Sequence, residues 1–180
     1  MRTASGRARS WGKLVVAAVA TFSATGIALA PSASASYTYY DVIARHSGRC
    51  LDVAEVSTAT GANVYQWDCW GGQNQQWRFK NLGNGYYQVI VAHSGKCLDV
   101  SGVGTGDGVN VQQWDCLSDQ LNQQWRLSFF TSANGYNWYK IVARHSGKCL
   151  DVTGENTGNG ANVQQWTCLA GQLNQQWRLN

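Results

Sequence analysis

Three copies of one octapeptide contain most of the side chains that could do chemistry in this chain. The string "HSGRCLDV" begins at His46, and "HSGKCLDV" begins at His93 and again at His145. Each copy holds a histidine, a cysteine and an aspartate, which are metal ligands, acid–base groups or structural groups according to their surroundings. The His-x-x-x-Cys spacing allows a zinc site, but the C-x-x-C pairs usual in structural zinc sites do not occur. The elements around the octapeptide decide between these roles.

The octapeptide belongs to a longer repeat. Two further motifs follow in the same order in each repeat. The first occurs as "NVYQWDC", "NVQQWDC" and "NVQQWTC", and the second is "NQQWR" in all three. The cysteines form pairs 19 positions apart, and the pairs recur after 47 and then 52 residues. We therefore divide the chain into repeats 37–84, 85–134 and 135–180.

Each repeat is expected to form four short β-strands. Runs such as "YYQVIVA" end at a His-Ser-Gly turn, "CLDV" follows, and a glycine-rich loop leads to "NVQQWDC" and then "QQWRL". No segment shows a sustained helical period, so we predict an all-β fold of about twelve strands. A propeller normally has more than three blades, and an open solenoid has more repeats and distinct caps. Closure of three equal units around a threefold axis is the better prediction.

Residues 1–35 have the pattern of a secretory signal peptide. Arg2, Arg7, Arg9 and Lys13 precede an apolar run that ends at "PSASAS", which contains an A-x-A cleavage site. An uncleaved membrane anchor is the alternative, although threonine, serine and glycine interrupt the run. We expect a secreted, extracellular protein.

Removal of this leader leaves a nearly neutral chain. Four of the 14 lysines and arginines lie in the leader, so ten remain to balance the 10 aspartates and glutamates. The net charge of +4 of the full chain is therefore no argument for nucleic acid or an anionic membrane as a partner. Residues 36–180 are long enough for one domain with its own core, which we expect to be a monomer.

The repeated Cys-Leu-Asp-Val, Val-x-x-Trp-x-Cys and Asn-Gln-x-Trp motifs together resemble those of the ricin B-type lectin domain. That family includes the family thirteen carbohydrate-binding modules of secreted glycan-degrading enzymes. The resemblance covers essentially all of residues 36–180. It implies a β-trefoil of three pseudo-threefold repeats that binds carbohydrate.

Six cysteines in an exported chain indicate disulfides, and we expect one within each repeat. The expected pairs are Cys50–Cys69, Cys97–Cys116 and Cys149–Cys168. Zinc held by the histidines and cysteines is the alternative. The three histidines are expected to form hydrogen bonds at their turns, and we expect no metal and no other cofactor.

Catalysis is not expected. Glycoside hydrolysis typically uses two carboxylates roughly 5–10 Å apart. The repeated Asp52, Asp99 and Asp151 would lie in separate lobes of a threefold fold, and the next repeated acid is replaced by Thr167 in the third copy. No G-x-S-x-G or other nucleophile motif occurs.

Sugar binding needs only a carboxylate and an amide for the hydroxyls and an aromatic ring for the apolar face. The resemblance assigns these roles to Asp52, Trp67, Asn74 and Gln75 in the first repeat, to Asp99, Gln112, Trp114, Asn122 and Gln123 in the second, and to Asp151, Gln164, Trp166, Asn174 and Gln175 in the third. Gln75, Gln123 and Gln175 are expected to brace the aspartates. The first site departs at Tyr65, where the other repeats have glutamine, so we expect it to be weaker or to differ in preference.

Several of these side chains also have a structural interpretation. Trp67, Trp114 and Trp166 could pack on the disulfides, and the aspartates could cap turns. The other repeated aromatic and aliphatic positions are expected to lie in the core; they are Trp77, Trp125 and Trp177 with Phe79, Leu127 and Leu179.

We therefore predict a lectin-like module that binds galactose- or xylose-type residues of polysaccharides. One alternative is an accessory fragment of a secreted glycoside hydrolase such as a xylanase, although we interpret the chain as self-contained. Another is a β-trefoil protease inhibitor or effector. That role would need a protruding inhibitory loop, whereas the longest loops here, such as "SGVGTGDG", are glycine-rich and are expected to be flexible.

Overall fold

The computed structural model describes residues 36–180, and the predicted signal peptide lies outside the described residues. The first repeat contains β1 (Tyr40–Ala44), β2 (Cys50–Val53), β3 (Val64–Trp67) and β4 (Gln76–Gly83). The second contains β5 (Tyr86–Val91), β6 (Cys97–Val100), β7 (Val111–Trp114) and β8 (Gln124–Ala133). The third contains β9 (Tyr136–Ala143), β10 (Cys149–Val152), β11 (Val163–Trp166) and β12 (Trp177–Leu179).

The connections contain five single-turn 3₁₀ helices, and residues 36–180 contain no α-helix. Three of the turns follow the second strand of a repeat: η1 (Ala54–Val56), η2 (Ser101–Val103) and η4 (Thr153–Glu155). The other two, η3 (Leu121–Gln123) and η5 (Leu173–Gln175), precede the fourth strand of the second and third repeats. The predicted all-β class is confirmed.

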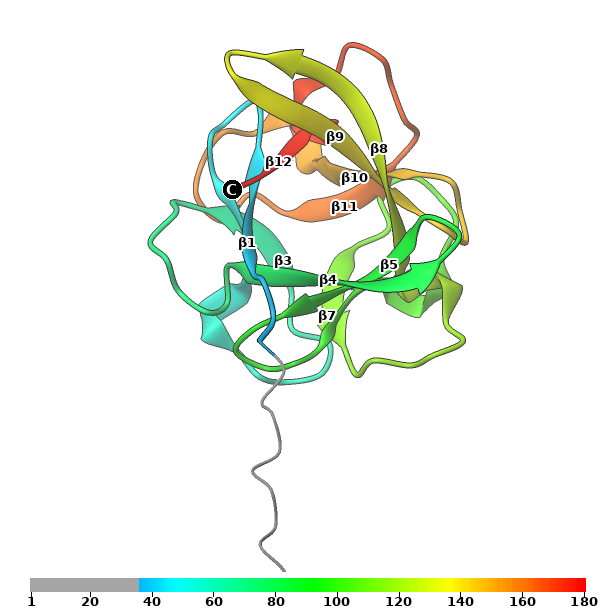
Figure 1. Ribbon diagram of the computed structural model, residues 1–180. Coiled ribbons are helices and arrows are strands. Elements are labelled where there is room, and N and C mark those ends of the chain that lie inside the picture. The colour runs from blue at the N-terminus through cyan, green and yellow to red at the C-terminus, as the bar shows by residue number, and fades with distance from the viewer. Residues whose placement is uncertain (1–35) are drawn as a thin grey trace, which may run out of the picture. The chain divides into compact units, whose positions relative to one another are not determined.

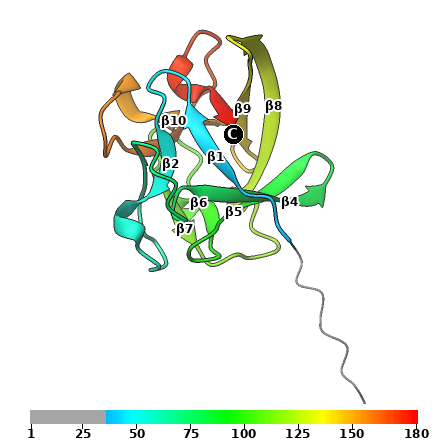
Figure 2. The same ribbon diagram turned by 60° about the vertical axis from the view of Figure 1, so that its left-hand side comes forward.

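The first and fourth strands of the repeats close a barrel of six antiparallel strands. β1 pairs with β12 and β4, β5 pairs with β4 and β8, and β9 pairs with β8 and β12, so the ring has no free edge. The remaining strands form three hairpins, β2–β3, β6–β7 and β10–β11, and each is joined to the barrel through the first strand of its repeat. Figures 1 and 2 show this β-trefoil, in which the hairpins lie at one end of the barrel. The propeller and the solenoid are excluded.

One disulfide spans the hairpin of each repeat, as predicted. The bridges join Cys50 to Cys69, Cys97 to Cys116 and Cys149 to Cys168, and no cysteine among the described residues is free. The sulfur atoms are therefore not available as thiolate ligands, and residues 36–180 contain no cluster of His, Cys, Asp and Glu that could hold a metal ion. The same residues contain no helix long and apolar enough to cross a membrane.

Three tryptophans connect the barrel to the hairpins. Trp77, Trp125 and Trp177 are fully buried, as predicted, because each ring fills the core with valines and leucines of all three repeats. Each indole N–H donates to the carbonyl oxygen of the leucine in the second strand of its own repeat, at 2.9–3.0 Å. Phe79, Leu127 and Leu179 are only partly buried and pack against this core.

The three hairpins meet at a ring of asparagines. The side chain of Asn63 donates to Asn162, that of Asn162 donates to Asn110, and that of Asn110 donates to Asn63, each at 2.9 Å. Every amide in the ring thus gives and accepts one hydrogen bond, which satisfies polar groups that burial would otherwise leave without water. The ring fixes the three hairpins relative to one another, and the candidate sites lie on these hairpins.

Candidate carbohydrate-binding sites

The register of each hairpin places the predicted carboxylate and the predicted aromatic ring on one face. In the second repeat, Asp99 pairs with Gln112 and Cys97 pairs with Trp114. Gln112 and Trp114 are two residues apart and therefore share a face of the strand, where Trp114 is a diagonal neighbour of Asp99. The third repeat repeats this register with the corresponding residues, Asp151 opposite Gln164 and Cys149 opposite Trp166.

Three amide side chains hold the Asp99 carboxylate. Gln112 Nε2 donates to Oδ1 at 3.0 Å, whereas Asn122 Nδ2 and Gln123 Nε2 donate to Oδ2 at 2.8 and 3.0 Å. Gln123 is itself fixed, because its Nε2 also donates to Asp115 O and its Oε1 accepts from Leu117 N. Gln123 therefore lies where the sequence predicted a glutamine that braces the aspartate. These bonds hold the carboxylate in one orientation, and the turn-capping interpretation is not what the structure shows.

The third repeat reproduces the arrangement within 0.1 Å. Asp151 accepts from Gln164 at 3.0 Å, from Asn174 at 2.9 Å and from Gln175 at 3.0 Å. Burial raises the pKa of the Asp99 and Asp151 carboxyls, and the hydrogen bonds from the three amides oppose that rise. The three amide donors orient each carboxylate as an acceptor for hydroxyl groups.

The asparagine of each set has an oxygen with no partner. Asn122 Nδ2 donates to Asp99 and to Val100 O, so the hydrogen-bond pattern assigns its other atom as the carbonyl Oδ1. This buried oxygen has no hydrogen-bond partner among the described residues, and the same holds for Asn74 and Asn174. Asn122 and Asn174 line the pockets described below. An unpaired buried acceptor is unfavourable unless a ligand or water satisfies it.

Each predicted stacking tryptophan packs on another repeat with one side of its ring and leaves the rest exposed to solvent. Trp67, Trp114 and Trp166 are 39%, 39% and 38% exposed. A side chain added at Gly61, Gly108 or Gly160 would meet the six-membered ring of the tryptophan of another repeat at 3.5–3.7 Å. The rings therefore pack on glycine turns of the neighbouring repeat. Their remaining surface is large enough to cover the apolar face of a sugar.

The second and third sets line pockets of about 370 and 360 Å³. Besides the predicted residues, each pocket has a rim that the sequence did not reveal, made of the 3₁₀ turn after the second strand and of residues after the second cysteine. The rim of the second pocket comprises Ser101, Gly102, Val103, Leu117 and Gln120, and that of the third comprises Thr153, Gly154, Glu155, Leu169 and Gln172. These rim positions could have been found from the sequence, because they lie at the same sequence distances from Asp99 and from Asp151.

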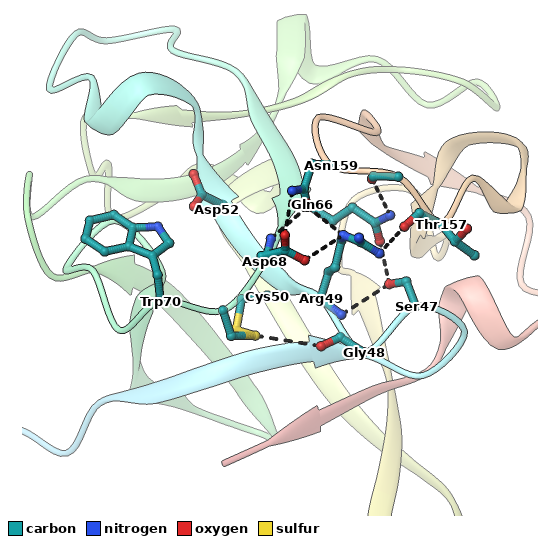
Figure 3. A network of polar contacts seen from close by, with 12 residues as sticks. Ser47, Gly48, Arg49, Cys50, Asp52, Gln66, Asp68, Trp70, Thr157 and Asn159 are labelled. Atoms are coloured by element: carbon teal, nitrogen blue, oxygen red, sulfur yellow. Dashed lines mark hydrogen bonds and ion pairs between the residues drawn. A yellow bond between two sulfur atoms is a disulfide. The ribbon is translucent and has the colours of Figure 1, made fainter.

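The first set departs from the other two, as the sequence indicated. Asp52 accepts from Asn74 at 2.9 Å and from Gln75 at 2.7 Å, whereas Tyr65, at the place of the third amide, makes no hydrogen bond to it; the Tyr65 hydroxyl accepts from Glu55 N. The ring of Trp70, which is 59% exposed, lies beside the carboxylate (Figure 3). Burial raises the pKa of Asp52, and hydrogen bonds from Gln75, Asn74 and Trp70 oppose the rise. The other two repeats have Leu117 and Leu169 at the position of Trp70.

The His-Ser-Gly part of the octapeptide holds a loop of another repeat. In the first repeat, Ser47 Oγ donates to Gln66 Oε1 at 2.7 Å (Figure 3). Gln66 Nε2 donates to the carbonyl oxygens of Asn156 and Gly158. His46 Nε2 also lies 3.0 Å from Asn156 O. The histidine at this turn thus forms a hydrogen bond, as expected, and its partner is a carbonyl oxygen of the loop that follows the second strand of a neighbouring repeat.

The same contacts recur around the threefold axis. His93 and Gln113 bind Ser57 O of the first repeat, and His145 and Gln165 bind Gly104 O of the second. The loop "SGVGTGDG", expected to be flexible, is in this way held at two carbonyl oxygens, since Gln165 also donates to Gly106 O. The octapeptide thus combines a clamp for the neighbouring loop, a disulfide and the carboxylate of a candidate site.

Comparison with known proteins agrees with this geometry. The family model described as ricin-type β-trefoil lectin domain-like matches residues 28–114 and 121–180. The chain belongs to that family. The fold and the family are those of carbohydrate-binding domains, and the lectin resemblance found in the sequence is confirmed.

Solved structures extend the comparison. A designed threefold-symmetric protein, ThreeFoil, is 53% identical, with a TM-score of 0.72 over 78% of this chain and 96% of that chain. An exo-β-1,3-galactanase from Clostridium thermocellum is 35% identical with the same TM-score, but the match covers 79% of this chain and only 30% of the galactanase. A ricin B-like lectin from Macrolepiota procera, solved in complex with lactose, is 24% identical with a TM-score of 0.66 over 82% of this chain and 97% of the lectin.

Proposed function

We propose that this protein is a secreted carbohydrate-binding module that binds galactose- or xylose-type residues of polysaccharides and catalyses no reaction. The observation that carries the proposal is the convergence, in two pockets of one chain, of a fixed buried carboxylate, an asparagine oxygen without a partner and a half-exposed tryptophan ring. These are the groups that a pyranose needs, because its hydroxyls require directed acceptors and its C–H face favours an aromatic surface. The lactose complex of the Macrolepiota lectin and the galactanase similarity support galactose as one candidate sugar.

The affinity of one pocket for a monosaccharide should be low. A shallow site with one carboxylate and one ring corresponds to a dissociation constant near the millimolar range, or about −4 kcal/mol. Three lobes on one rigid fold can engage a single polymer, and the tethered second contact raises the apparent affinity about 10²-fold or more when the spacing permits. We therefore expect modest binding of free sugars and much tighter binding of polysaccharides by the monomer.

A glycan array combined with a pull-down on insoluble xylan tests this function. The wild-type protein should be retained on at least one galactose- or xylose-containing polymer, and free sugar of the same type should elute it. The variant Lys80→Ala, a change in β4 outside the second- and third-repeat pockets that carry the proposal, is the matched surface control and should be retained like the wild type. Retention on no glycan by folded protein would contradict the proposal.

A second candidate function is an accessory module of a glycoside hydrolase, which the galactanase similarity favours, since the matched region is only 30% of that enzyme. The binding chemistry would be the same, and the catalytic groups would belong to another domain. Purified protein should release no reducing sugar from xylan, arabinogalactan or β-glucan. Turnover that stays with the protein through repeated purification would contradict the non-catalytic assignment.

A further inference from the structure

The 3₁₀ turn after the second strand of each repeat carries an exposed side chain in an unfavourable backbone conformation. Val56, Val103 and Glu155 occupy the same position of the three repeats, four residues after the aspartate, with φ of 54°, 55° and 54°. Residues with a side chain rarely adopt this left-handed conformation, and for a β-branched valine it is a clear outlier. Glycine would adopt it without strain, as Gly102 and Gly154 do one position earlier. The repeats nevertheless retain a side chain at this position.

Burial does not explain these side chains. Val103 is 52% exposed, and Glu155 is exposed as well. Neither belongs to the core, and Glu155 takes part in none of the ion pairs among the described residues. Both line their pockets next to the aspartate and the tryptophan. A strained, exposed side chain at a pocket rim fits contact with a ligand better than a role in folding.

We propose that this position sets the charge preference of each pocket. This inference rests on the proposed sugar-binding function and names the class of sugar. With Glu155 at its rim, the third pocket favours sugars that carry an ammonium group, such as galactosamine, and disfavours uronic acids. With Val103 in its place, the second pocket lacks this rim charge and distinguishes these sugars less.

The lysine of the third pocket lies behind the pocket wall and not at the rim with Glu155. Lys140 is buried behind the pocket wall, where its Nζ donates to Leu169 O and to Gln175 Oε1. Burial lowers the pKa of Lys140, and the charge of Asp151 opposes that shift, so this lysine interacts with the carboxylate at the floor. Gln88 holds the corresponding place in the second repeat, where it donates to Leu117 O.

The test compares single pockets. Asp52→Ala with Asp99→Ala leaves the third pocket, and Asp52→Ala with Asp151→Ala leaves the second. In these two backgrounds the affinities for galactose, galactosamine, galacturonate and xylose are measured by NMR titration at low salt. Glu155→Val and Val103→Glu are then introduced, each a residue that the same strained position already accepts in another repeat. Circular dichroism checks the folding of every protein.

Charges several ångströms apart near a protein surface change affinity by about three- to tenfold per ligand. The third pocket should prefer galactosamine to galacturonate, Glu155→Val should remove most of that preference, and Val103→Glu should create it in the second pocket. About 1 M salt should suppress it, because the Debye length then falls to about 3 Å. Lys140→Gln should leave the sign of the preference unchanged.

The outcomes separate this inference from the proposed function. A third pocket that binds galactose or xylose, but whose preference between the two charged sugars does not respond to Glu155→Val, overturns the inference alone. So does a pocket that binds xylose and neither charged sugar. Failure of the wild type to bind galactose, xylose or their polymers overturns the proposed function and this inference with it.

Discussion

Lys148 Nζ lies 2.7 Å from Asp107 Oδ1, although the two residues belong to different repeats. In the other repeats the matching cation pairs with an acid of its own repeat, Lys96 with Asp115 and Arg49 with Asp68. The third repeat has Thr167 at that place, and its hydroxyl and backbone N–H both donate to Asp107. A loop of the second repeat therefore supplies the carboxylate that the third repeat lacks.

This exchange predicts a rescue. Asp107→Ala should lower the urea midpoint of unfolding only slightly, because the ion pair is exposed to solvent. Adding Thr167→Asp should restore the midpoint, since it recreates the pairing of Lys96 with Asp115. Asp119→Ala, which removes an exposed aspartate outside these ion pairs, is the control and should have no effect. A double variant less stable than Asp107→Ala alone would contradict the exchange.

Two neighbouring glutamines on opposite faces of β11 should separate stability from binding. Gln165 is fully buried and donates to Gly104 O and Gly106 O at 2.9 and 2.8 Å. Gln165→Ala removes both bonds, leaves Gly106 O without this donor while Gly104 O keeps His145, and should cost about 1–3 kcal/mol of unfolding free energy. Gln164→Ala removes a donor to Asp151 and should mainly weaken sugar binding by the third pocket. Urea unfolding and sugar titration of both variants test this, and the reverse assignment of effects would contradict it.

The pH dependence of binding should differ from that of stability. Burial raises the pKa of Asp52, Asp99 and Asp151 above the ordinary 3.8. An acid whose folded-state pKa is raised contributes stability below its unfolded pKa, and loses that contribution as pH rises through the folded pKa. Protonation of these groups as pH falls therefore does not unfold the protein.

Sugar binding needs the ionised carboxylate as a hydroxyl acceptor, so affinity should fall at pH values still above 3.8 while the fold persists. Sugar titration and circular dichroism over the same pH series measure the two properties. Affinity that stays constant down to pH 3.8, or that is lost only together with the circular dichroism signal, would contradict this prediction.

The repeated residues allowed the sequence to predict the fold and the floor of each pocket. Asp99 and Trp114 recur in all three repeats and Gln112 in two, at fixed spacing, and a hairpin register brings residues at that spacing to one face. The buried role of Trp125 followed in the same way, because its motif is identical in every copy. Because the motif residues occur in register in three repeats, chance does not explain their spacing.

The sequence could not predict features that depend on contacts between repeats, or on a residue that differs in one repeat from its counterparts in the others. The cross-repeat pairing of Lys148 with Asp107 arises from packing of two lobes, and no local pattern encodes it. The place of the Trp70 ring beside Asp52 could not be predicted, because no repeat other than the first has a tryptophan at that position. Glu155 differs from its counterparts in the other repeats, so a search for repeated residues passes over it.

Affinity electrophoresis in gels that contain the retaining polysaccharide tests the central claim most directly. The proteins are the wild type, Asp52→Ala, Asp99→Ala, Asp151→Ala and the double variant Asp99→Ala/Asp151→Ala, each checked by circular dichroism. Each of the single changes at Asp99 and Asp151 should weaken retention in part, the double variant should lose far more than either, and Asp52→Ala should matter least. A folded double variant that is retained like the wild type would show that these pockets are not the binding sites.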